Sequence, residues 1–403
     1  MTLNRRTVLK GGAALGAATL ATPYLARAAA HANKEWILRG SIPLTGPFAQ
    51  AGVDGLKNTQ DWVEMKNASG GIAGKQVNLQ YEDSGYNPTT SLANFKKTMS
   101  DDVKPHFYSG DSTGFMKLVQ PELSRTPVLN GGTSFATDLA DPANSPYQFI
   151  TGPTYNAMAE INMKYIAQQG GKRVAFVYSD NEYGRDPIEH AKKIAAEQGL
   201  EVVHEEVTDL QGAEVQTHVA QVRRSNPDHI FIHGYVTSVW PQIIGTARAF
   251  GMDAKFVGTF WGMELVIART VQEKLGDALD GYAGVMPYRY FYEAAESPAY
   301  QELAAFKTAK YGDEFPGYIT TWSLQGLATL ALLEKVFTDV TEADIEPTPE
   351  NLSAALGKVQ GWDSGGYFGL PVNVDDHAIN QARVYQYSAE KSLFLPVSDT
   401  IEV

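Results

Sequence analysis

The sequence predicts an α/β protein with two doubly wound parallel-sheet lobes, and three observations lead to this prediction. Short apolar strand patterns alternate with helical patterns along most of the chain. The alternation restarts after Gly152-Pro153, which indicates a second unit. In that unit, residues 174–178 form a continuous apolar run, which is typical of a strand buried on both faces of a parallel sheet.

In the first unit, strands and helices are recognised by the period of their apolar residues. Leu92, Phe95 and Met99 share one face of a helix, and Gly70-Gly71 ends the helix before it. The expected order is strand 37–44, helix 53–66, strand 76–81, a helix around 92–99, strand 106–108 and strand 126–129.

The second unit repeats this plan. Met158, Ile161 and Tyr165 form the apolar stripe of its first helix, and Gly199 stands where a helix C-cap is expected. After that first helix, the expected order is strand 174–178, helix 184–198, strand 201–206, a helix around 215–222, strand 229–233, a helix that closes at 251 and strand 255–258. A helical stretch at 299–335 and short strands at 372–374 and 383–387 are too few for a third domain, so we expect them to complete the two lobes.

Residues 1–30 have the pattern of an export signal. Arg5-Arg6 precede an apolar run at 11–21, and small residues around Ala28 form a cleavage region. The run is shorter than the roughly 20 residues that span a bilayer, so a membrane anchor is the weaker interpretation. The paired arginines followed by Leu9-Lys10 resemble the twin-arginine export signal.

Composition excludes several classes of protein. Removal of the four basic residues in 1–30 takes the formal charge from −13 to −17, which argues against binding nucleic acid or anionic lipid. The chain has no cysteine, so disulfides and thiolate metal sites are excluded. A lipid anchor would also need a cysteine, and we therefore expect an unattached periplasmic protein that acts as a monomer.

No motif for catalysis or cofactor binding is complete. The segment 70–75 lacks the phosphate-loop pattern, because Ser69 and Gln76 stand where that pattern needs glycine and a hydroxyl residue. The eight histidines form no clustered ligand set, and there is no nucleophile elbow. We expect no enzyme activity, no cofactor and no metal.

The informative feature is a set of small hydroxyl and glycine residues where strands end and helices begin. Such positions line the ligand crevice of an open α/β sheet, and helix N-termini there offer N–H groups to an anion. Plain helix capping is the alternative explanation. The candidates are Ser109, Gly110, Ser112, Thr133 and Ser134, with the aromatic residues Tyr155, Tyr183, Tyr235 and Trp261 at matching points of the second unit.

Several motifs, in order, resemble the branched-chain amino-acid binding proteins, which are type I periplasmic solute-binding proteins. They are Pro43-Leu44-Thr45-Gly46-Pro47, the stretch 67–74, Tyr81-Glu82-Asp83, the stretch 179–184, Gly234-Tyr235 and the stretch 318–326. The resemblance implies two lobes that close on a ligand and are joined by three crossovers. These would lie near Gly152, Met286-Pro287 and Gly365-Gly366, giving an N-lobe of 31–152 plus 287–365 and a C-lobe of 153–286 plus 366–403. The resemblance also implies that Phe48, in the first loop, forms an aromatic wall of the ligand site.

One departure from that family bears on the ligand. Amino-acid-binding members carry an acid just after the strand that ends near Gly258, whereas this chain reads Thr259-Phe260-Trp261-Gly262. A buried ammonium needs a partner. We therefore expect a small, partly apolar organic acid, with benzoate- or phenylacetate-like acids bound more tightly than leucine or valine. In the alternative, Glu264 or Asp111 holds an ammonium.

The function expected from these features is that of a ligand carrier for the membrane permease of an ABC importer. A carrier of amino acids or small amides with the same fold remains open, as does a ligand sensor that docks on a membrane receptor. A redox enzyme exported by the twin-arginine route is disfavoured, because the chain has no dinucleotide fingerprint and no credible metal set.

Overall fold

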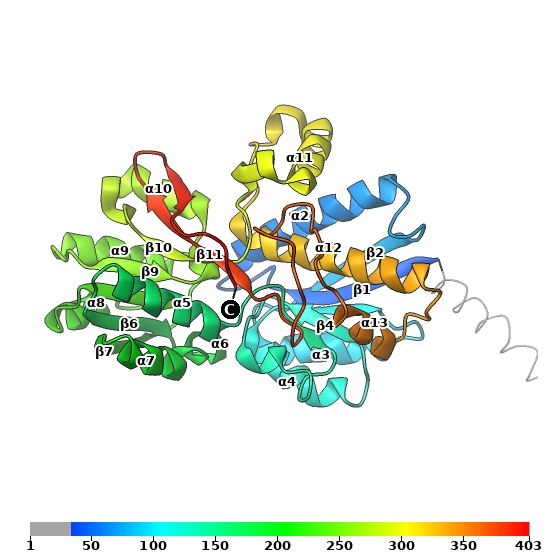
Figure 1. Cartoon of the computed structure of the whole chain (residues 1–403), viewed down its shortest axis with the longest axis horizontal. Helices are drawn as coiled ribbons and strands as arrows, with labels where there is room; N and C mark the ends of the chain where they lie inside the picture. The colour runs from blue at the N-terminus through cyan, green and yellow to red at the C-terminus, as the bar shows by residue number, and fades with distance from the viewer. Residues whose placement is uncertain (1–33, 403) are drawn as a thin grey trace, which may run out of the picture.

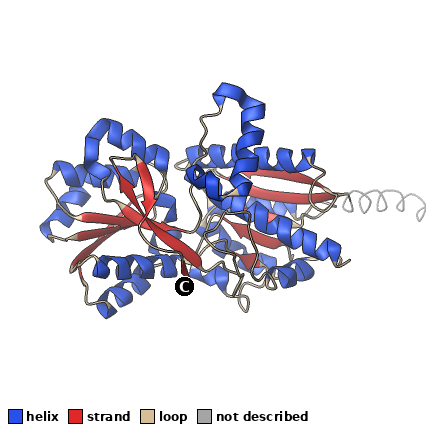
Figure 2. Cartoon of the chain, turned by 45° about the horizontal axis from the view of Figure 1, so that its top comes forward, coloured by secondary structure: helices blue, strands red, loops and turns tan. Residues whose placement is uncertain are grey.

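Two β-sheets with helices on both faces form two lobes that lie side by side (Figure 1; Figure 2). The computed structural model describes residues 34–402. The export signal expected at 1–30 lies outside these residues. Within them, no helix combines the length and the apolar character needed to cross a bilayer.

The N-lobe contains a parallel sheet with strand order β2-β1-β3-β4-β5. Its first elements are β1 (Glu35–Ile42), α2 (Ala49–Ala68), β2 (Gln76–Asp83), α3 (Pro88–Thr98), β3 (Phe107–Gly110), α4 (Thr113–Leu123), β4 (Leu129–Gly132) and β5 (Gln148–Phe149). Three later helices join this lobe, with α12 packed along α2: α11 (Pro298–Tyr311), α12 (Thr321–Glu342) and α13 (Pro349–Leu356).

The C-lobe contains the sheet β12-β11-β10-β9-β8-β6-β7, in which β11 pairs antiparallel with β10, β12 and β13. Its helices are α5 (Tyr155–Gln168), α6 (Glu182–Arg185), α7 (Ile188–Glu197), α8 (Val215–Arg224), α9 (Val239–Ala249) and α10 (Leu265–Leu275). Its strands are β6 (Arg173–Ser179), β7 (Glu201–Thr208), β8 (His229–His233), β9 (Lys255–Gly258), β10 (Ala283–Met286), β11 (Gln381–Ser388), β12 (Leu393–Pro396) and β13 (Ile401–Glu402). The predicted α/β class with doubly wound lobes is confirmed.

The chain passes between the lobes three times: after β5, after β10 and before β11. Ala378 still forms a bridge with Ile150 beside the first sheet, and the second sheet begins at Gln381. The third passage therefore lies beyond Gly365-Gly366, where the sequence placed it. The chain runs along the N-lobe first, because residues 372–378 pair with neighbouring segments of that lobe.

Two expected elements differ from the structure. The helical stretch at 299–335 is divided into α11 and α12, because Gly312 and Gly317 have positive φ angles of 54° and 68° and end the helical path between them. Residues 372–374 form no strand; Val372 makes only an isolated bridge with Trp362.

The carboxyl ends of β3 and β4 lie unusually close together, and this closeness shapes the site. A Cβ atom at Gly132 would lie 2.3 Å from the carbonyl oxygen of Gly110, so only glycine fits there. Both strands end at the edge of the sheet that faces the C-lobe.

Candidate ligand-binding site

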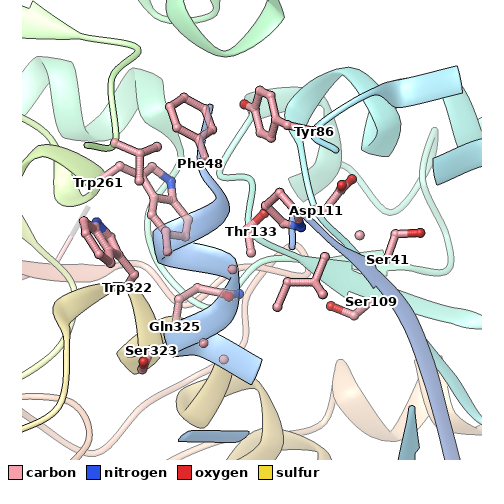
Figure 3. A pocket seen from close by; sticks show the side chains of 18 of the residues that line it. Ser41, Phe48, Tyr86, Ser109, Asp111, Thr133, Trp261, Trp322, Ser323 and Gln325 are labelled. Atoms are coloured by element: carbon pink, nitrogen blue, oxygen red, sulfur yellow. The ribbon is translucent and has the colours of Figure 1, made fainter. Parts of the chain in front are cut away.

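A pocket lies between the lobes, at the carboxyl ends of the N-lobe strands. The space open to the centres of water molecules is about 80 Å³, which is several times what one water needs. Figure 3 shows Trp261 and Trp322 on one side of it and Asp111, Ser41 and Ser109 on the other. The pocket therefore has an aromatic side and a polar side.

The polar side comes from the strand ends of the N-lobe. Ser41 lies near the end of β1, Ser109 near the end of β3, and Thr133 follows β4. The Ser41 hydroxyl lies 3.1 Å from the Tyr108 hydroxyl and accepts from the Asn94 amide at 3.3 Å. Adjacent parallel strands end at one edge of the sheet, so these hydroxyls converge although they are far apart in sequence.

The N-termini of α2 and α12 form the floor of the pocket. Phe48 precedes α2, and Trp322, Ser323 and Gln325 lie in the first turns of α12. Gln325 donates to the Gly132 carbonyl at 2.6 Å, which attaches α12 to the end of β4. The late segment 321–326 is thus part of the same pocket as the early strand ends.

The aromatic side comes mainly from the C-lobe. Tyr155 and Tyr183 have ring centroids 5.1 Å apart, and the Trp261 indole donates to the Tyr155 hydroxyl at 3.0 Å. Phe135 of the N-lobe packs against Tyr155 and Trp261 with centroids 5.7 and 6.1 Å away. Because Trp261 lines the pocket and is only 5% exposed, its ring is a wall for a ligand.

His233 supports this aromatic side from behind. One ring nitrogen lies 2.9 Å from the Tyr183 carbonyl oxygen and the other 2.8 Å from the Thr259 hydroxyl. Burial lowers the pKa of His233 to about 3, so the ring is neutral at ordinary pH. It therefore supplies no positive charge to a ligand.

Asp111 is the one acidic or basic side chain among the described residues that line the pocket. It is 3% exposed, and its Oδ1 accepts from the Ser91 hydroxyl at 2.9 Å. Its Oδ2 is buried without a hydrogen-bond partner of normal geometry. Burial raises the pKa of Asp111, although the hydroxyls of Ser84, Ser91 and Ser112 act in the opposite direction.

Seven of the ten residues predicted for the site line this pocket: Phe48, Ser109, Gly110, Thr133, Tyr155, Tyr183 and Trp261. The other three lie behind it. Ser112 caps α4 by accepting from the Phe115 N–H at 3.2 Å, and the Ser134 hydroxyl lies 2.7 Å from that of Thr113. The Tyr235 hydroxyl lies 2.8 Å from that of Thr208, and the next residue, Val236, lines the pocket instead.

The sequence reasoning missed several residues that line the pocket. They are mainly Ser41, Tyr86, Trp322, Ser323 and Gln325. The segment 318–326 carries part of the family resemblance, and this resemblance is the signal in the sequence for the α12 residues. Glu264 lies outside the pocket; it caps α10 by accepting from the Val266 N–H at 2.9 Å.

An ion pair joins the lobes beside the pocket. Lys117 of α4 lies 3.0 Å from Asp186, which follows α6, and 3.5 Å from Glu182. Asp186 also accepts from the Thr137 N–H at 3.4 Å. The Asp186 side chain is only 5% exposed, so the pair is partly shielded from water in this arrangement of the lobes.

Comparisons with known proteins agree with this geometry. The profile of a family described as periplasmic binding protein matches residues 40–392. A leucine-, isoleucine-, valine-, threonine- and alanine-binding protein of Pseudomonas aeruginosa is 23% identical over 77% of this chain and 80% of its own length.

Two solved structures share the fold. A branched-chain amino acid ABC transporter protein from Thermus thermophilus with bound valine has a TM-score of 0.82 at 19% identity, covering 92% of this chain and 97% of its own. A solute-binding protein from R. palustris in complex with 4-hydroxybenzoate has a TM-score of 0.76, also at 19% identity and with the same coverage of both chains.

Proposed function

This chain belongs to the periplasmic binding protein family, and from this premise we propose that it is the ligand-binding component of an ABC importer. In this proposal the protein is exported through its twin-arginine-like signal and remains free in the periplasm. It captures a small organic acid between its lobes and delivers it to a membrane permease. No step of this cycle is catalytic.

The observation that supports this ligand class is that aromatic and polar groups lie on different sides of the pocket. Trp261 and Trp322 lie on one side of it, and the hydroxyls of Ser41 and Ser109 lie on the other. Tyr155 and Tyr183 extend the aromatic side, because Trp261 donates to Tyr155 and the rings of Tyr155 and Tyr183 pack together. A flat apolar body would contact the rings, and aromatic pairs add about 0.5–1.5 kcal/mol beyond the burial of area. Hydroxyl and N–H groups at the strand ends would bind the carboxylate.

Calorimetry on pairs of ligands with the same head group tests this proposal. We expect 3-phenylpropanoate to bind more tightly than 4-methylpentanoate, and phenylalanine more tightly than leucine. The Trp261→Ala variant should lose about ten-fold in affinity for the aromatic member of each pair and less for the aliphatic member. Trp362→Ala is the control, because Trp362 lies on the N-lobe outside the pocket.

Tighter binding of the aliphatic member in both pairs would disprove the aromatic preference. The absence of binding by all four acids would disprove the proposed ligand class.

Enclosure of the ligand requires the lobes to approach each other, and the Lys117–Asp186 pair should favour the closed arrangement. We expect Lys117→Met to weaken ligand binding about five-fold, which corresponds to about 1 kcal/mol for a partly exposed pair. Lys96→Met is the matched control, because Lys96 pairs with Glu122 within the N-lobe at 3.0 Å. Equal affinities for the two variants would show that the interlobe pair does not contribute to closure.

A further inference from the structure

Gly55 is a glycine inside a helix at a position where the backbone does not call for one. It lies within α2, well away from both ends of that helix, and its φ angle is not positive. A glycine in a helix interior destabilises the fold relative to alanine, because the unfolded chain has more freedom to lose. The conformation of α2 therefore gives no reason for a glycine at this position.

Close packing explains the other helix glycines but not Gly55. Six glycines lie within the α-helices of the described chain: Gly52, Gly55, Gly114, Gly184, Gly245 and Gly326. A Cβ atom built on any of them except Gly55 would come closer than 3.0 Å to a neighbouring atom; at Gly52 it would lie 2.0 Å from the Pro43 carbonyl oxygen. At Gly55 the nearest atom is Cδ1 of Ile42, at an ordinary contact distance of 3.8 Å. A methyl group would fit there, so this space is free.

The free space beside Gly55 belongs to the ligand pocket. Ala51, Gly55 and Thr59 are four residues apart on one face of α2, and all three line the pocket together with Ile42. The Thr59 hydroxyl donates to the carbonyl oxygens of Gly55, at 2.8 Å, and Leu56, at 3.0 Å, so its hydrogen bonds stay within the helix. The groups that α2 and β1 offer to a ligand here are therefore apolar.

We propose that Gly55 is a specificity-determining residue, because the room left by its missing side chain receives an apolar part of the ligand. This inference rests on the proposed function and narrows it to acids whose apolar arm is long enough to reach α2. Each additional buried methylene group adds about 0.8 kcal/mol, which corresponds to about four-fold in affinity. The unmodified protein should accordingly bind 3-phenylpropanoate more tightly than phenylacetate, which is one methylene shorter.

The Gly55→Ala variant tests the inference through the ratio of these two affinities. The new methyl group occupies the free space, so calorimetry should show binding of 3-phenylpropanoate about ten-fold weaker and binding of phenylacetate less than about three-fold weaker. The preference for the longer acid should then be lost. An unchanged ratio of the two affinities would overturn the inference. Failure of both acids to bind the unmodified protein would instead refute the proposed function.

Thermal unfolding without ligand separates a filled space from a damaged fold. Alanine is the better helix former, so Gly55→Ala should unfold at the same temperature as the unmodified protein or at a higher one. Gly245→Ala is the matched control: Gly245 also lies inside a helix, α9, but outside the pocket, and its new methyl group would meet only the end of the exposed Leu275 side chain. This control should leave the ratio of affinities unchanged, and an equal change in both variants would contradict the role of Gly55.

Discussion

Replacement of Asp61 by leucine is expected to lower the free energy of unfolding by about 3–5 kcal/mol, because it leaves a buried ammonium without its carboxylate. Lys307 of α11 and Asp61 of α2 form an ion pair in which each side chain is at most 3% exposed. Lys310, at 3.0 Å, and the Tyr311 hydroxyl, at 2.7 Å, also contact Asp61. Burial alone would raise the pKa of Asp61, but these donors lower it.

The Asp61–Lys307 ion pair should also help to hold the pocket wall in position. Lys307 donates to the side-chain oxygen Oδ1 of Asn58 at 2.8 Å, and the side-chain nitrogen Nδ2 of Asn58 donates to the Ser323 hydroxyl at 2.9 Å. Ser323 lies in the pocket wall. The network therefore positions α2 and α12 together, and Asp61→Leu should weaken ligand binding as well as stability.

Chemical unfolding of three variants shows whether Asp61→Leu loses stability through the unpaired charge or through poorer packing. The double variant Asp61→Leu/Lys307→Met should recover most of the stability lost by Asp61→Leu, because two apolar side chains of similar volume leave no charge buried. Glu64→Ala removes only the exposed partner of Lys310 and should cost less than about 1 kcal/mol. A double variant as unstable as Asp61→Leu would show that the loss is one of packing rather than of charge.

Glu264 is expected to make stability depend on pH between about 4.5 and 7. It lies in the C-lobe, is fully buried, and accepts from Thr321 N–H at the start of α12 in the N-lobe at 2.6 Å. Burial raises its pKa from 4.5 to about 7, although the N–H groups of Val266 and Thr321 lower it in part. The folded protein therefore binds a proton more tightly at this site than the unfolded chain does.

This difference in proton affinity sets the direction in which stability changes with pH. The contribution of Glu264 to stability is fully present below pH 4.5 and is lost as the pH rises through about 7. The loss amounts to about 3 kcal/mol, the free energy that corresponds to the difference between the two pKa values. The Glu264→Gln variant cannot ionise, so its stability relative to the unmodified protein should increase by that amount from pH 4.5 to pH 8.

Unfolding curves at several pH values measure this change. Glutamine carries a donor where the carboxylate had a second acceptor, and this mismatch lowers the free energy of unfolding by an amount that does not vary with pH. The quantity that tests the prediction is therefore the change with pH of the difference in unfolding free energy between Glu264→Gln and the unmodified protein. Tyr318→Phe, which removes only a hydroxyl 3.4 Å from the carboxylate, should keep the pH dependence. A difference between Glu264→Gln and the unmodified protein that is flat over this range would contradict the prediction.

The sequence was informative wherever a local pattern was sufficient. The apolar run at 174–178 became part of β6, which lies between β8 and β7 in the C-lobe sheet, because a strand between two helical layers tolerates apolar side chains on both faces. Hydroxyl and glycine residues at the ends of β3 and β4 pointed to the edge of the sheet where the pocket lies, since ligands of open α/β sheets bind at that edge. The third passage between the lobes was also predicted, but near Gly365-Gly366, whereas the structure places it between Ala378 and Gln381.

Which of those residues line the pocket depended on the tertiary structure. Ser109 and Thr133 line the pocket, whereas Ser112 and Ser134, in the same two loops, lie behind it. A step of one residue in a strand or a helix start turns a side chain to another face, and the sequence pattern of a short loop does not fix that rotation.

By itself, the sequence determined the α/β class, the two lobes and the segments from which the pocket is built. Only the tertiary structure brought Gln325 to Gly132 and Trp261 to Tyr155, residues that are far apart along the chain. It also left one oxygen of Asp111 without a hydrogen-bond partner of normal geometry and gave the Glu264 carboxyl three partners, in Val266, Tyr318 and Thr321. The physical reason is that apolar period and turn residues act over a few positions, whereas burial and hydrogen-bond partners arise when distant segments pack together.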